Sequence, residues 1–128
     1  MISPRTAANV LLAGLGVLVI FHALMILGVL PADIAWGGRA DAAGNVVLLE
    51  VVGLVVTLLF AAVVAAKAGY LGARPAGRLV TVAMWIVFGY FVLNVAGNLV
   101  STSSLERAIF TPVSAILALL ALRVAMSR

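Results

Sequence analysis

The sequence contains no cysteine and a single histidine. The lack of cysteine excludes disulfide bonds, thiolate zinc sites, cysteine-ligated iron–sulfur clusters and a thiol nucleophile. A haem held by two histidines would need two copies of the chain, and no spacing of histidine and carboxylate residues predicts a metal site. Nucleotide-binding and hydrolase motifs of the Walker and G-x-S-x-G kinds are also missing. The sequence therefore predicts no cofactor and no metal, and it favours a protein that is not an enzyme.

Charged residues are scarce as well. They make up 9% of the chain, whereas hydrophobic residues make up 66% and the mean hydropathy is +1.31. A soluble domain is about one-quarter charged and about half apolar. A soluble fold of this size could not bury so much apolar surface, so the protein is predicted to lie in a lipid bilayer. The net charge of +4 does not indicate nucleic acid as a partner, because the basic residues flank the apolar segments.

Four apolar segments are long enough to cross a bilayer as helices, which takes about 20 residues each. They are residues 7–30, 46–66, 79–100 and 104–126. The first is longer than the apolar region of a signal peptide, and we expect it to be retained. The short connections predict one all-α membrane domain over residues 1–128, folded as an up-down-up-down transmembrane four-helix bundle.

The start of the fourth helix has two interpretations. Residues 103–106 match a capping box, which would start the helix at Ser104 and leave Pro112 in its interior. Alternatively, Thr111 caps a helix that has Pro112 at its first position. That helix would be only about 22 Å long, which is short for a span. We favour the earlier start, with Glu106 as the acid of the capping box.

Basic residues are distributed unequally between the two sides of the predicted membrane. Of the 8 lysine and arginine residues, six lie on the side shared by the two termini and the loop between the second and third segments. These six are Arg5, Lys67, Arg74, Arg78, Arg123 and Arg128. Because positive charge is retained on the cytoplasmic side, this excess predicts that both termini are cytoplasmic.

Nearly all polar residues of the spans fall in the half of the membrane away from the termini, within about 12 Å of that interface. Polar groups inside a bilayer are costly, so each is a candidate functional residue. Helical spacing places Tyr90, Asn94 and Asn98 on one face, and Glu50 and Thr57 on another. The predicted ligand-binding pocket consists of His22, Glu50, Tyr90, Asn94, Asn98 and Thr111, capped by a loop that holds Asp33, Trp36, Arg39 and Asp41.

These polar residues also have structural interpretations. The asparagines and His22 could serve only as hydrogen-bonding groups between helices. Glu50 must be protonated, paired or hydrated inside a bilayer, and its candidate partners are Arg39, Arg107 and His22. A proton relay between Glu50 and His22 is a further hypothesis.

Several segments together resemble a known group of proteins. Residues 31–39 contain a D-x-x-W-G-G-R pattern and follow a first span that holds His22. The later spans contribute Glu50, Asn94, Gly97, Asn98, Phe110, Thr111 and Pro112. In these features the chain resembles, over nearly its whole length, a group of small bacterial four-span membrane proteins without an assigned activity. The resemblance implies a bacterial inner-membrane protein and no particular reaction. A looser likeness to DoxX-type proteins rests only on size and number of spans.

Three functions are compatible with this pattern. The pocket could bind or transport a small polar or cationic ligand, or a proton; transport would need a dimer or a partner, because the cytoplasmic half is apolar. The protein could instead be a structural or accessory subunit of a larger membrane complex. It could also be a membrane enzyme acting on a lipid or quinone, although no motif supplies catalytic residues. The lipid bilayer is the predicted partner, and the sequence is compatible with a homodimer or with membership of a larger membrane complex.

Overall fold

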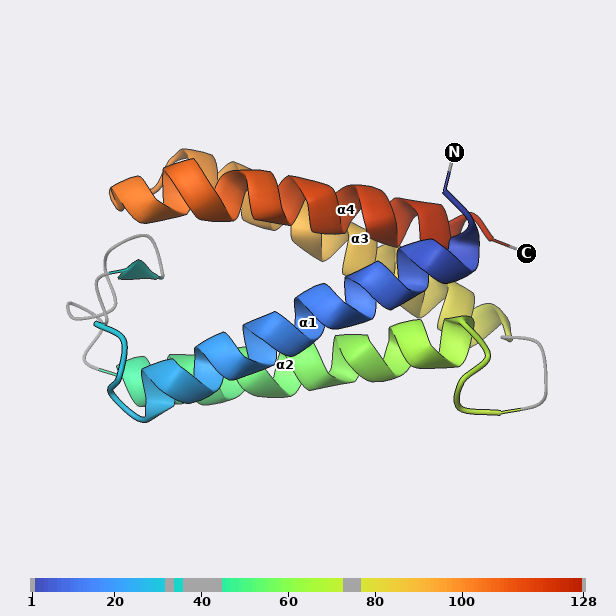
Figure 1. Cartoon of the computed structure of the whole chain (residues 1–128), viewed down its shortest axis with the longest axis horizontal. Helices are drawn as coiled ribbons and strands as arrows, with labels where there is room; N and C mark the ends of the chain where they lie inside the picture. The colour runs from blue at the N-terminus through green and yellow to red at the C-terminus, as the bar shows by residue number, and fades with distance from the viewer. Residues whose placement is uncertain (1, 32–33, 36–44, 73–76, 128) are drawn as a thin grey trace.

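The computed structural model describes residues 2–31, 34–35, 45–72 and 77–127. Within them run the long helices α1 (Pro4–Ile26), α2 (Val46–Lys67), α3 (Arg78–Leu99) and α4 (Thr111–Ala125), the last preceded by the π-helical turn η3 (Glu106–Phe110). The helices alternate in direction and form an up-down-up-down four-helix bundle (Figure 1). Both termini lie at one end of the bundle, which we call the terminal end. We call the opposite end the distal end.

Local capping determines both ends of α1. The Ser3 hydroxyl accepts a hydrogen bond from the Thr6 amide at 3.0 Å, and Pro4 stands in the first turn, where no amide hydrogen is needed. After the helix, Gly28 has a φ of 70°, the left-handed conformation that commonly ends helices. α1 therefore begins and ends earlier along the chain than the predicted apolar segment 7–30, because hydrophobicity does not determine where a helix is capped.

Helices α2 and α3 are each 22 residues long, which corresponds to about 33 Å at 1.5 Å per residue. This length is sufficient for the hydrocarbon core of a bilayer, which is about 30 Å thick. α2 begins after Asn45, and Gly69 follows its end with a φ of 80°. Both helices lie within one residue of the predicted segments 46–66 and 79–100.

An irregular turn begins the fourth membrane-crossing helix. The helical backbone starts at Ser104, and the Ser103 hydroxyl accepts a hydrogen bond from the Glu106 amide at 3.4 Å, as in a capping box. The π-helical turn η3 follows and leads directly into Pro112 near the start of α4. A proline ring clashes with the carbonyl group of the preceding turn in a regular helix. The wider π turn accommodates this clash, so Pro112 lies inside a continuous helical segment.

The terminal half of the bundle is a closely packed apolar core. Its largest side chains come from all four helices and are almost completely buried: Leu11, Leu15, Val64, Met84 and Val124. Helices α1 and α4 approach closely at Gly14, where an added Cβ would lie 2.7 Å from the Leu117 Cδ2 atom. Small residues at such positions are typical of helix contacts in membranes.

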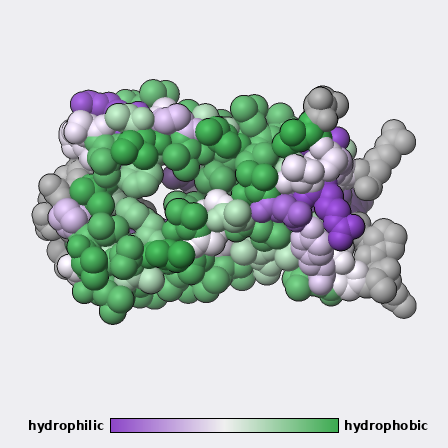
Figure 2. Space-filling model, viewed as in Figure 1, coloured by the Kyte–Doolittle hydropathy of each residue, from purple (hydrophilic) through white to green (hydrophobic). Residues whose placement is uncertain are grey.

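Hydrophobic residues cover most of the face of the bundle drawn in Figure 2, and a hydrophilic group lies at the terminal end. At that end Lys67 Nζ donates to Thr81 Oγ1 at 3.1 Å, and the Arg5 guanidinium lies 5.6 Å from the centre of the Tyr70 ring. Counting η3 with α4, the structure has 4 helices long and apolar enough to span a membrane in the described part of the chain. The architecture is that of a multi-pass membrane protein.

Candidate functional site

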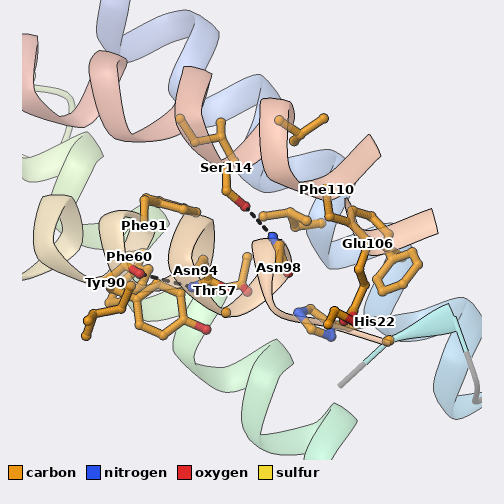
Figure 3. A pocket seen from close by; sticks show the side chains of 18 of the residues that line it. His22, Thr57, Phe60, Tyr90, Phe91, Asn94, Asn98, Glu106, Phe110 and Ser114 are labelled. Carbon is orange, nitrogen blue, oxygen red and sulfur yellow. Dashed lines mark hydrogen bonds between the residues drawn. The ribbon is translucent and has the colours of Figure 1, made fainter. Parts of the chain in front are cut away.

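A cavity lies between the α1–α2 pair and the α3–α4 pair, which separate toward the distal end (Figure 1). Its volume is about 560 Å³, inside the range of about 300–1,000 Å³ that is usual for ligand pockets. The lining side chains come from the four helices and from η3, and they converge on a common space (Figure 3). The polar ones are His22, Glu50, Thr57, Tyr90, Asn94, Asn98, Ser101, Glu106 and Ser114.

A polar contact between a histidine and a fully buried glutamate joins α1 to α2 at the cavity. Glu50 is 0% exposed, and its Oε2 atom lies 2.6 Å from Nδ1 of His22. This hydrogen bond provides a partner for a carboxyl group whose burial would otherwise be costly. Gly53, one turn along α2, makes room for the imidazole, because an added Cβ would lie 2.5 Å from His22 Cε1. His22 is thus one of the predicted partners of Glu50 that the structure confirms, whereas Arg39 lies outside the described residues.

A second carboxyl group lies on the cavity wall. Glu106 is 6% exposed, and its carboxylate accepts a hydrogen bond from the Ser101 hydroxyl. Arg107 Nη1 donates to the Ser101 carbonyl at 3.2 Å, which holds this segment in place. Sequence analysis assigned Glu106 to the capping box alone. The amide of Glu106 does take part in that cap, but its side chain faces the cavity.

The asparagines of α3 stand four residues apart and both line the cavity. Asn98 Nδ2 donates to Ser114 Oγ at 3.1 Å, which connects α3 to α4 (Figure 3). Asn94 Nδ2 donates to the Tyr90 carbonyl of its own helix, also at 3.1 Å. Asn98 therefore makes the contact between helices that the structural interpretation expects, whereas the Asn94 amide group bonds within α3.

Aromatic rings form much of the remaining wall, and sequence analysis did not select any of them except Tyr90. The centre of the Phe60 ring lies 4.9 Å from that of Tyr90 and 6.2 Å from that of Phe91, in edge-to-face arrangements. Phe21 of α1 makes a similar contact with Phe110 of η3, at 5.3 Å. All five rings line the cavity. In an all-apolar span no sequence pattern distinguishes such phenylalanines from those that face lipid.

The other residues predicted for the pocket either lie away from the cavity or fall outside the described part of the chain. Thr111 does not line the cavity; its hydroxyl donates to the Glu106 carbonyl at 3.2 Å and so supports the η3 turn. The prediction for Thr111 assumed a regular helix, and the π turn changes the direction of the residues beside it. Asp33, Trp36, Arg39 and Asp41 lie outside the described residues. Ala35, from the same predicted loop, is 7% exposed and lines the cavity.

In the part of the chain that the structure describes, no group of three or more His, Asp or Glu side chains could hold a metal ion. No family model, curated protein or solved structure matches the chain.

The cavity is suited to a positive charge. Glu50 and Glu106 contribute carboxyl groups, and none of the described lining residues is a lysine or arginine. Among these described lining residues His22 is the one basic side chain, and it is bonded to Glu50. The faces of aromatic rings are also electronegative and attract cations. Because water is excluded from the interior of a bilayer, these attractions act at a lower dielectric constant than at a protein surface.

Proposed function

We propose that this protein binds a small organic cation in the distal cavity. The observation that carries the proposal is the placement of two buried carboxyl groups, Glu50 and Glu106, on the wall of one aromatic-lined cavity. Buried carboxylates are stabilised by a positive partner, and aromatic rings around a cation are the usual means of recognising quaternary ammonium groups. The volume of about 560 Å³ is ample for such a ligand.

We also propose that the protein lies in a bacterial inner membrane with both termini in the cytoplasm. Support comes from the excess of basic residues at the terminal end, including Arg5, Lys67, Arg78 and Arg123. Lysine and arginine in short loops are retained on the cytoplasmic side. In this orientation the distal cavity lies in the outer half of the membrane.

The structure of a single copy favours binding of a cation over its conduction across the membrane. Leu11, Leu15 and Met84 belong to the apolar core that closes the cavity toward the terminal end. A cation moving through this core would lose every polar partner, at a cost that membrane proteins avoid by lining their pathways with polar groups. Transport would therefore need a second copy or another subunit to complete a pathway.

Cation binding is tested with tetramethylammonium and the purified protein in lipid nanodiscs, by isothermal titration calorimetry. We expect saturable binding, and we expect Glu50→Gln and Glu106→Gln each to weaken it by about tenfold or more, because each variant removes a negative charge that attracts the cation; tenfold corresponds to about 1.4 kcal/mol. Lys67→Gln, which changes a charge at the terminal end, is the control and should keep the affinity of the natural sequence. Affinity that stays unchanged in both glutamate variants would refute the proposal.

The orientation is tested with single cysteines, since the natural chain has none. Thr102→Cys places a thiol at the distal end and Ser127→Cys places one at the terminal end. A membrane-impermeant maleimide added to intact cells should modify only the former, and both should react after permeabilisation. The opposite pattern would show that the termini are outside.

A further inference from the structure

A hollow opens in the side of the bundle, in the distal half of the face where α1 and α4 lie (Figure 2). The apolar side chains that α1 and α4 contribute to the cavity lining are Leu18 and Phe21 of α1 and Val113 and Leu117 of α4. We call these four residues the α1–α4 rim. All are apolar; Val113 is 38% exposed, whereas Leu117 is 5% exposed and belongs to the apolar core. The rim belongs to helices that can cross a membrane, so its exposed member Val113 would face lipid acyl chains.

Apolar residues close the cavity toward the terminal end, and a buried residue contributes to its wall at the distal end. The apolar core, which contains Leu11 and Leu15, fills the terminal half. At the distal end the buried residue Ala35 forms part of the wall. Phe21 and Phe110 are in ring contact, with 5.3 Å between their centres, and join α1 to η3 on the distal side of the hollow. The side opening therefore connects the polar cavity with the bilayer.

From this geometry we infer that the ligand is a cationic amphiphile, whose charged head lies in the cavity and whose hydrocarbon chain passes between α1 and α4 into the bilayer. The inference rests on the proposed cation binding and adds the class of cation and its route. The chain needs no polar partner, and the α1–α4 rim offers none. The head finds the carboxyl groups of Glu50 and Glu106 on the cavity wall.

A water-soluble cation fits the side opening less well. To pass the α1–α4 rim it would first have to enter hydrocarbon without a partner, which costs a charged group several kcal/mol. An amphiphile already lies in the membrane with its head at the interface and its chain among the lipids. The polar half of the cavity is the distal half, so such a head would move a short distance from the distal interface.

A second apolar depression provides an internal control. It is a groove of about 540 Å³ on α2 and α3, lined by apolar residues that include Leu59, Ala83 and Ile86. We call it the α2–α3 groove. Its described lining contains no carboxyl group. A hydrocarbon chain that simply prefers apolar surface would occupy this groove as readily as the α1–α4 rim.

The test uses two probes with the same head. One is dodecyltrimethylammonium with a photoactivatable diazirine in the middle of its chain, and the other is tetramethylammonium, which has no chain. The full-length protein in lipid nanodiscs is photolysed with the long probe, and the labelled residues are mapped by peptide mass spectrometry. We expect labelling at the α1–α4 rim to exceed labelling at the α2–α3 groove several-fold. Excess tetramethylammonium should suppress the rim labelling and leave the groove labelling unchanged.

Two variants sharpen the result. Glu50→Gln should reduce rim labelling by about tenfold, equivalent to 1.4 kcal/mol, whereas Ile86→Trp in the groove should leave it unchanged. Equal labelling of rim and groove that tetramethylammonium does not suppress would overturn the lateral route, although calorimetric binding of tetramethylammonium would still support cation binding. If tetramethylammonium itself shows no saturable binding, the proposed function is wrong and the inference falls with it.

Discussion

Replacing Gly53 by alanine is expected to disrupt the contact between His22 and Glu50. The added Cβ would lie 2.5 Å from Cε1, 3.0 Å from Nδ1 and 3.1 Å from Nε2 of the His22 ring, whereas ordinary contacts begin at 3.4 Å. The imidazole must therefore move by roughly 1 Å. Its hydrogen bond to Glu50 Oε2 starts at 2.6 Å, so a shift of this size lengthens it beyond useful range.

The expected change in the free energy of unfolding is the sum of two destabilising contributions and one stabilising contribution. Inserting a methyl group into a packed site costs about 1–3 kcal/mol, and losing a charge-assisted hydrogen bond costs about 1.5–3 kcal/mol. Alanine gains about 1 kcal/mol over glycine in helix propensity. Because the ring can relax only by giving up the bond, the two costs overlap, and we expect Gly53→Ala to lower the free energy of unfolding by about 1–3 kcal/mol.

Equilibrium unfolding in a mixed detergent system measures this loss, with Gly16→Ala as the matched control. An added Cβ on Gly16 meets nothing within 4 Å, so the same substitution should be neutral or slightly stabilising there. A double-mutant cycle gives the decisive comparison. In a His22→Ala background the ring is absent, and Gly53→Ala should then cost little. If the cost of Gly53→Ala is the same with and without the imidazole, the steric reasoning is wrong.

Three smaller effects are expected in the same unfolding assay. Gly14→Ala should be nearly neutral, although its Cβ would approach Leu117 Cδ2 to 2.7 Å, because the end of a leucine side chain can rotate away; a loss like that of Gly53→Ala would show that Leu117 is fixed. Ser114→Ala removes the acceptor of the Asn98 bond and should cost about 0.6 kcal/mol, the average for such bonds between membrane helices; a cost above about 2 kcal/mol would mean that the bond organises the cavity. Gly28→Ala should cost about 1–2 kcal/mol, since φ there is 70°; an unchanged stability would show that the end of α1 rearranges freely.

The fold could be predicted from the sequence because lipid imposes a simple rule on the chain. Every backbone group inside a bilayer needs an internal partner, so an apolar segment of about 20 residues becomes a helix. The number and order of the helices follow from this rule. Their ends depend instead on individual caps, and the left-handed Gly28 ends α1 before the apolar segment ends.

The cavity could be predicted only in part. Polar residues inside a span are conspicuous, so His22, Glu50, Asn94 and Asn98 could be assigned to one pocket by depth alone. Glu106 could not, because the π turn changes the helical register just where its side chain turns inward. The phenylalanine rings were missed for a different reason. In these helices residues facing lipid are as apolar as residues facing the interior, so hydrophobic periodicity does not separate the two.

The two halves of the bundle have complementary roles in this account of the site. The terminal half joins the helix pairs through close contacts such as Gly14 against Leu117, and it contains no cavity polar group. The distal half leaves the pairs apart, with Glu50 on one pair and Glu106 attached to the other. A cation bound there would be attracted to both pairs at once and would oppose their separation.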